Sequence, residues 1–356
     1  MKKTLYFLGL LCFLGIGNLK AQSPVATLEH NDTTTVFYGI NAFSDAYTTS
    51  QNGDLIFLSS GTFTSPTYIS KGIRVYGAGC YFDATSNETT TITDFYLQNG
   101  CDNFLLEGVI CTNIYLNVCP ITNISFLRSK ITNIAAQQNG TGYYTSVLIE
   151  NCIITGTISS NGLISNSVFR NNIFHNSNLG YSVNGGSVII FDNNVFFSQY
   201  TTINKSDCYF KNNIFYTVYA YPYLSSIFTS NNSNCTYLNN LFCENSFPNY
   251  SPTNINNTNY GNNILLANYY VNSYDSIFVS TNADFNNFSF QNDYHLKYPT
   301  LYKGADNTEV GVYGGTFAFK EKAMPSNPHI VSKIISTQTD LNGNLPVNIK
   351  AKAQKY

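Results

Sequence analysis

The chain has 356 residues, a formal net charge of −2 and only 11% charged residues. This balance lacks the basic surface of nucleic-acid-binding proteins and the high charge of disordered chains, so we expect neither class. Tyr and Phe are abundant, with 28 and 26 copies, whereas Trp is absent. Asparagine is frequent throughout the chain, and its abundance requires a structural reason.

The first residues have the pattern of a secretion signal. Met1-Lys2-Lys3 precede an apolar stretch over 5–16, and Ala21 is a small residue suited to cleavage. The stretch is too short to span a bilayer, and no later stretch of about 18 apolar residues follows. We therefore expect residues 1–21 to be a signal peptide, and the mature protein to be secreted, periplasmic or at the cell surface without a transmembrane segment.

The next segment predicts a cap followed by strands. Residues 41–51 suit a short helix that ends at Asn52-Gly53, just before the strand-like sequence DLIFLSSGTF over 54–63. The sequence TYISKGIRVYGAG over 67–79 predicts two further strands with a glycine corner. An open solenoid needs such a cap to cover its apolar end.

A six-residue pattern then recurs along the middle of the chain. Weak copies begin at Leu105, Leu127 and Ile149, and clear copies follow as FRNNIF (169–174), FDNNVF (191–196), FKNNIF (210–215), YLNNLF (237–242) and YGNNIL (260–265). Successive third positions lie 19 to 27 residues apart. Aromatic and β-branched residues broken by Asn, Gly and Ser predict strands and corners, and the period predicts a stack of coils. A leucine-rich repeat has a similar period, but its LxxLxLxxN spacing is absent.

Stacked parallel strands place equivalent residues about 4.8 Å apart, so each position of the pattern forms a column. We expect the first position, from Leu105 to Tyr260, and the fifth position, from Val109 to Ile264, to form inward-facing apolar stacks. We expect the third-position asparagines to occupy left-handed corners and to bond the equivalent amide of the next coil. These columns predict an all-β protein, a single right-handed parallel β-helix over 22–320, and we expect a monomer.

The second position carries the candidate catalytic residues. Charges of alternating sign run through Arg128, Glu150, Arg170, Asp192 and Lys211. One interpretation is an ion-pair ladder that fixes the register of the coils. The other is a polysaccharide site with Arg170 or Lys211 as base or carboxylate clamp and Glu150 or Asp192 as acid. Two carboxylates separated by two coils, about 9.6 Å, would suit an inverting hydrolase.

Tyrosines between the repeats offer a candidate ligand-binding surface. The densest cluster is YTVYAYPYL over 216–224, which contains Tyr216, Tyr219, Tyr221 and Tyr223. Tyrosine rings stack on sugars and hydrogen-bond to them, although exposed aromatics are also ordinary in a chain so rich in tyrosine.

Two segments resemble a known family. GDLIFLSSGTF over 53–63, after its capping helix, resembles the opening of the pectate-lyase-like right-handed parallel β-helix superfamily. DYHLKYPTLYKGADNTEVGVYGGTF over 293–317 is similar to the closing segment of secreted β-helix proteins of Bacteroidetes-type bacteria. The resemblance covers about 33–320 and implies the fold and a polysaccharide partner. The resemblance suggests calcium as a cofactor. The charged second position of the repeat, which we call the charged column, offers no cluster of carboxylates, so no cofactor is predicted.

The remaining residues add smaller expectations. HIVSKIIS and LPVNIKAKA flank 340–344 and predict a two-stranded extension over 321–356, either a small cap or the start of a sandwich module. The cysteines after the signal peptide show no CxxC spacing, and we expect mostly buried free thiols rather than a zinc site or a disulfide framework. His175 is expected in a solvent-facing loop, and His295 packed within its terminal segment.

Two functions remain open at this point. The first is an exported or cell-surface β-helix that binds carbohydrate or serves as a structural module without catalysis. The alternative is a divergent polysaccharide lyase or glycoside hydrolase, although no HExxH, GxSxG or paired-Asp motif with Gly-His-Gly is present. A charged column beside a groove would favour the enzyme, and a flat, fully paired ladder would count against it.

Overall fold

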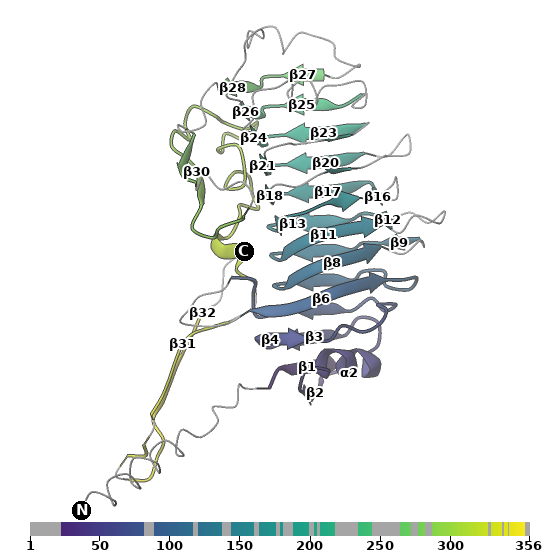
Figure 1. Ribbon diagram of the computed structural model, residues 1–356, viewed down its shortest axis with the longest axis vertical. Helices are drawn as coiled ribbons and strands as arrows, with labels where there is room; N and C mark the ends of the chain where they lie inside the picture. The colour runs from purple at the N-terminus through teal and green to yellow at the C-terminus, as the bar shows by residue number, and fades with distance from the viewer. Residues whose placement is uncertain are drawn as a thin grey trace, which may run out of the picture.

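The computed structural model describes residues 23–81, 89–116, 120–136, 144–159, 164–175, 179–180, 188–198, 203–204, 207–217, 234–243, 264–271, 277–281, 287–326, 329–336, 338–340 and 342–352. The described chain is nearly all β and forms one elongated parallel β-solenoid (Figure 1). The predicted fold class, an all-β solenoid with a helical cap and a β appendage, is confirmed.

The N-terminal cap is a hairpin and a helix. Strands β1 (Val25–His30) and β2 (Thr33–Tyr38) pair antiparallel, and β1 also pairs antiparallel with β3 (Leu55–Leu58). Helix α2 (Ala42–Thr49) buries Phe43, whose ring centroid lies 6.0 Å from that of Phe95 inside the solenoid. The helix therefore closes the apolar interior, as its sequence predicts.

Two long sheets form the walls of the solenoid. The first continues from β3 through parallel strands β5 (Arg74–Tyr76), β7 (Leu105–Glu107), β10 (Ser125–Leu127), β13 (Leu148–Glu150), β17 (Ser167–Arg170), β20 (Ile189–Asp192), β23 (Cys208–Lys211), β25 (Thr236–Leu238) and β27 (Ile264–Leu266). The second contains β4 (Gly61–Phe63), β6 (Thr90–Leu97), β8 (Ile110–Leu116), β11 (Lys130–Ala136), β14 (Ile153–Ile154), β15 (Ile158–Ser159), β18 (Ile173–His175), β19 (Leu179–Gly180), β21 (Val195–Ser198), β22 (Ile203–Asn204), β24 (Ile214–Thr217), β26 (Leu241–Cys243) and β28 (Tyr269–Val271). A short third sheet contains β9 (Ile121–Thr122), β12 (Tyr144–Thr145) and β16 (Ile164–Ser165).

The register corrects the alignment of the outer copies of the repeat. Phe126 pairs with Leu106 and with Ile149, so the first copy begins at Leu106, one residue later than predicted, and the second begins at Phe126, one residue earlier. At the other end Leu238 pairs with Leu266, so the last copy is LLANYY over 265–270 rather than YGNNIL. The copies from Ile149 to Phe242 keep the predicted alignment.

The amide ladder lies one position later than expected. The fourth-position asparagines are buried, and each of Asn172, Asn194, Asn213 and Asn240 donates from Nδ2 to Oδ1 of the next, over 2.9–3.1 Å and ending at Asn268. The third-position asparagines instead have left-handed backbone, with φ between 52° and 56° for the residues from Asn151 to Asn239. The left-handed corner is therefore confirmed, and the third-position ladder is wrong.

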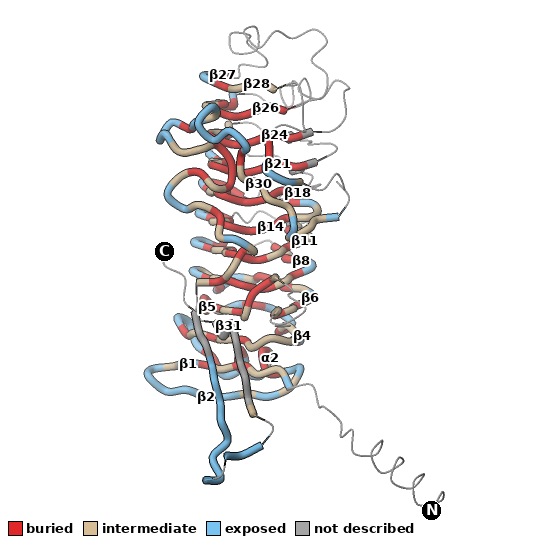
Figure 2. Tube along the Cα trace, turned by 90° about the vertical axis from the view of Figure 1, so that its left-hand side faces the viewer, coloured by how far each residue is buried: buried red, intermediate tan, exposed pale blue. Residues whose placement is uncertain are grey.

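Aromatic stacks fill the interior, where Figure 2 shows the buried residues of the coils. The first position holds Phe169, Phe191 and Phe210, with ring centroids 4.7–4.9 Å apart. The second interior stack is the sixth position, where Phe196 lies 4.8 Å from the rings before and after it. The fifth position, predicted to face inward, is buried on the outside of the second sheet.

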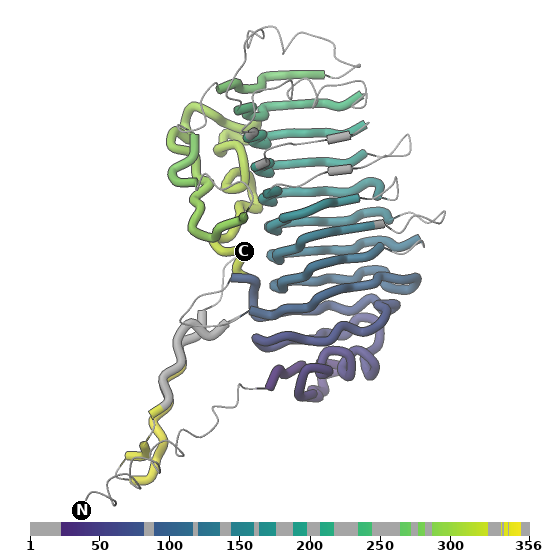
Figure 3. Tube along the Cα trace, in the orientation of Figure 1, coloured from purple at the N-terminus to yellow at the C-terminus, as the bar shows by residue number. Residues whose placement is uncertain are grey.

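A C-terminal segment covers that outer face. We call residues 287–326 the strap; it includes β30 (Asp293–Leu296), which pairs with β29 (Phe278–Ser280), and ends in the 3-10 helix η2 (Glu321–Ala323). Its apolar residues, among them Val310, Val312 and Phe319, form one cluster with the fifth-position residues Ile173 and Val195. The strap lies beside the coils and runs back toward the N-terminal end (Figures 1 and 3).

The third-position asparagines hold the strap. Asn212 Oδ1 accepts from Ala305 N over 3.1 Å, and Asn171 Nδ2 donates to the carbonyls of Val312 and Gly314 over 2.9 and 2.8 Å. Asn151 Nδ2 donates to the Phe317 carbonyl over 3.0 Å. This corner therefore fixes the strap to successive coils.

The chain then leaves the solenoid as an antiparallel ribbon. Strand β31 (His329–Ile335) pairs with β32 (Val347–Lys352), which confirms the predicted two-stranded extension. The ribbon projects away from the coils in Figure 1.

Candidate functional site: a cleft between the charged column and the strap

The four candidate catalytic residues lie side by side on one sheet. Glu150, Arg170, Asp192 and Lys211 occupy equivalent positions on β13, β17, β20 and β23, in the predicted order. Arg128 does not belong to this column. It lies at a left-handed corner with φ of 45°, and its guanidinium pairs with the buried Glu107 over 3.1 Å.

The charges of the column form two ion pairs. Arg170 Nη2 lies 2.5 Å from Glu150 Oε2, and Lys211 Nζ lies 2.8 Å from Asp192 Oδ2. All four side chains are at most about one-third exposed, so each pair is partly shielded from water. Each cation of the column therefore has a carboxylate partner, as the ladder interpretation predicts.

The column is not flat, because the strap forms a wall along it. Between the two lies a cleft of about 490 Å³. Its solenoid side carries Arg170, Asp192 and Lys211, and next to them the corner amides, which are those of Asn171, Asn193 and Asn212. Its strap side carries Asp306, Thr316 and Phe317. The cleft thus contains three of the four predicted residues, and Glu150 enters only as the partner of Arg170.

Asp192 has a perturbed carboxyl group. Burial raises its pKa above the usual value for aspartate, and the nearby charge of Asp306 adds to the rise. The hydrogen bond and charge of Lys211, together with the charge of Arg170, act in the opposite direction. Asp192 therefore takes up a proton more readily than an ordinary surface aspartate.

Phe317 is a feature that the sequence did not single out. Its ring lies on the guanidinium of Arg170, with Cζ 3.4 Å from the ring centroid, yet the residue is 45% exposed. One ring face is covered by a cation and the rest of the side chain reaches solvent. Phe317 and Asp306 lie outside the repeat, and only the segment quoted from 293 to 317 pointed to this region.

The predicted tyrosine surface lies elsewhere. Tyr216 is 4% exposed and stacks on Phe197, with centroids 4.9 Å apart, in the cluster beneath the strap. Tyr219, Tyr221 and Tyr223 lie outside the described residues. None of the residues that line the cleft is a tyrosine.

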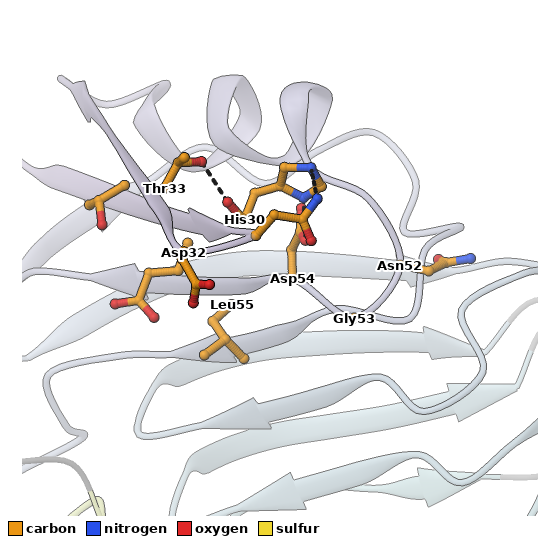
Figure 4. A pocket seen from close by; sticks show the side chains of 10 residues that line it. His30, Asp32, Thr33, Asn52, Gly53, Asp54 and Leu55 are labelled. Carbon is orange, nitrogen blue, oxygen red and sulfur yellow. Dashed lines mark hydrogen bonds and ion pairs between the residues drawn. The ribbon is translucent and has the colours of Figure 1, made fainter.

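A second, more open pocket of about 630 Å³ lies in the N-terminal cap (Figure 4). His30 Nδ1 lies 2.8 Å from Asp54 Oδ1, and Asn31 Nδ2 lies 2.9 Å from His30 Nε2. Asp54 Oδ2 also accepts from Gln51 N over 2.7 Å. Both ring nitrogens are therefore engaged, and these contacts tie the β1–β2 turn to the turn before β3.

The other polar residues of interest are structural. His175 was expected in a solvent-facing loop, but it is 1% exposed and stacks on Phe197, because position 175 continues β18 beneath the strap. His295 stacks on Tyr313, with centroids 3.5 Å apart, within the strap. Seven cysteines of the described chain are buried free thiols, as expected, and Cys119 lies outside it.

Metal-ligating clusters and membrane-spanning helices are both absent from the described residues. The described residues contain no group of three or more His, Cys, Asp or Glu side chains placed to hold a metal ion. In the same part of the chain, no helix has the length and apolar character needed to cross a membrane. The chain matches no family model, no curated protein and no solved structure at a significant level.

Proposed function

We propose that this protein is an exported or cell-surface solenoid that binds carbohydrate in the cleft between the charged column and the strap, without cleaving it. The carrying observation is the composition of that cleft, where the exposed ring of Phe317 stands beside charged and amide side chains. An aromatic ring face with hydrogen-bonding groups around it is the combination that suits a sugar, whose rings have apolar faces and polar edges.

The ion pairs favour binding over catalysis. Arg170 and Lys211 were the candidate bases, and each is held by a carboxylate at 2.5 or 2.8 Å. A cation held in such a pair keeps its geometry and already has a carboxylate partner, which suits the wall of a binding site better than proton abstraction. The signal-like pattern of the first residues supports an extracellular ligand.

Binding can be tested with a panel of soluble polysaccharides and purified mature protein, by affinity electrophoresis and calorimetry. We expect Phe317→Ala to weaken binding about tenfold, because the stacking face is lost. Tyr68→Ala is the matched control, since Tyr68 is 48% exposed and does not line the cleft. The proposal fails if no polysaccharide binds, or if the two variants bind equally well.

A divergent polysaccharide lyase or glycoside hydrolase is the second candidate, and one observation favours it. Asp192, whose pKa burial raises, shares the cleft with a second carboxylate, Asp306. A carboxylic acid with a raised pKa is the usual proton donor in glycoside hydrolysis. Incubation with each bound polysaccharide, followed by assays for new reducing ends and for unsaturated products, distinguishes the candidates. Product that disappears in Asp192→Asn would establish the enzyme.

A further inference from the structure

The charges of the cleft allow the ligand class to be narrowed. We propose that the cleft binds a neutral glycan rather than a polyuronate, an inference that rests on the proposed carbohydrate binding. The cleft lacks a cation that is free of a carboxylate partner. It offers acceptor atoms that receive no hydrogen bond from the described residues. A ligand rich in hydroxyl groups and without charge matches both properties.

The charges around the cleft carry a net negative balance. A site that binds a uronate through an ion pair needs an Arg or Lys that is free to clamp the ligand's carboxylate. Here the guanidinium of Arg170 and the ammonium of Lys211 are already bound by Glu150 and Asp192. Asp306 adds a third carboxylate to the cleft, and no Lys or Arg of the described chain forms an ion pair with it. Two cations and three carboxylates leave one negative charge, which repels a uronate.

The cleft also offers a hydrogen-bond acceptor that no donor of the described chain occupies. Asp306 Oδ1 accepts from Thr308 N and Thr308 Oγ1 over 3.1 and 2.7 Å, whereas its Oδ2 receives no donor among the described residues. A sugar hydroxyl can donate to this oxygen, but the carboxylate of a uronate is an acceptor only. The exposed side chain of Asp306 is accessible to such a ligand.

A buried amide of the cleft has the same character. Asn193 is 3% exposed, and its Nδ2 donates to Asp192 Oδ1 over 3.1 Å, which fixes the orientation of the amide. Its Oδ1 is then a buried acceptor without a donor in the described chain. Such an atom costs about 1–3 kcal/mol unless a donor reaches it. This unpaired oxygen adds acceptor character, and no donor, to its side of the cleft.

The ring of Phe317 also suits a neutral sugar. Arg170 covers one face of the ring at 3.4 Å, so a ligand can stack only on the other face. The apolar face of a neutral pyranose suits that position, with its hydroxyls directed toward Asp306 and the corner amides. The cleft volume of about 490 Å³ lies within the range typical of small-ligand sites.

The test compares neutral oligosaccharides, such as glucans, mannans and xylans, with polygalacturonate and alginate at low ionic strength. We expect the wild type to bind at least one neutral glycan about tenfold more tightly than either polyuronate. Asp306→Lys supplies a free cation, so it should raise polyuronate affinity and weaken binding of the neutral glycan. Asp45→Lys, on the exposed face of α2, changes the net charge equally and is the control.

The outcomes separate this inference from the function on which it rests. Polyuronate binding by the wild type that is lost in Phe317→Ala would overturn the neutral-glycan inference and leave carbohydrate binding in the cleft intact. Equal gains of polyuronate affinity in Asp306→Lys and Asp45→Lys would also overturn it, because net charge rather than the cleft would then decide. A protein that binds neither class of glycan would overturn the proposed function itself.

Discussion

Asn193 and Asn194 are neighbours in the chain, yet they belong to two columns with opposite environments. Asn194 points into the solenoid, where its amide bonds the amides and carbonyls of adjacent coils. Asn193 lies at the outer corner, has left-handed backbone with φ of 55°, and lies against the strap. In the inner column, asparagine therefore serves through its side-chain hydrogen bonds. In the outer column, it serves through its tolerance of left-handed backbone.

The difference matters because the inner amides make more hydrogen bonds than the outer ones. Each inner amide satisfies backbone groups that a turn inside the coil would otherwise leave buried and unpaired. The outer amides make fewer bonds: the side chain of Asn212 accepts from Ala305 N over 3.1 Å and donates to Asp192 Oδ1 over 3.5 Å. We therefore expect substitutions in the inner column to cost much more than those in the outer one.

The largest effect is expected for Asn213→Ala in the inner column. Asn213 accepts from the backbone and side chain of Asn194 over 2.9 and 3.0 Å, and donates to Phe191 O and Asn240 Oδ1 over 2.9 Å each. Each partner left buried without a bond costs about 1–3 kcal/mol, so the free energy of unfolding should fall by about 3 kcal/mol or more. Equilibrium denaturation in urea measures it, and a loss below about 1 kcal/mol would contradict the ladder.

A smaller effect is expected in the outer column, where two positions form a matched pair. Glycine keeps the left-handed corner at both Asn212 and Asn239, but only Asn212 accepts a hydrogen bond from the strap, at Ala305 N. Asn212→Gly should therefore lose about 1 kcal/mol more than Asn239→Gly. Hydrogen exchange should show faster opening of the strap in the first variant alone. Equal losses would mean that the corner amide does not hold the strap.

Periodicity explains how much of this fold the sequence could predict. The coils from 149 to 242 were aligned correctly because each carries an asparagine at its left-handed outer corner. Gly108, Arg128 and Ala267 replace the outer asparagine in other coils, and all three keep the left-handed backbone. Without that asparagine, the copies that contain Gly108 and Arg128 were misaligned by one residue. The copy that contains Ala267 was misaligned by five, because another Asn pair precedes it at 262–263.

The candidate site was predictable only on its solenoid side. Arg170, Asp192 and Lys211 were found because they recur at one position of the repeat. Asp306 and Phe317 come from the strap, which has no repeat, and its contact with the coils joins positions about a hundred residues apart in sequence, such as Ala305 and Asn212. Such long-range docking leaves no local pattern to read, so the cleft itself could not be predicted.

The smallest effect is expected where the outer column lacks its asparagine and the residue is exposed. Ala267 has φ of 50°, a conformation that costs most L-residues about 1–2 kcal/mol but is easier for asparagine. Ala267→Asn should therefore raise the free energy of unfolding by up to about 1 kcal/mol, whereas Ala267→Val, with its branched Cβ, should lower it. Because the last coils unfold more readily than the centre of a solenoid, hydrogen exchange at β27 and β28 is the sensitive measurement. If the Asn and Val variants exchange at the same rate there, the left-handed corner does not favour asparagine. Contacts with the strap alone would then explain why the outer column consists of asparagines.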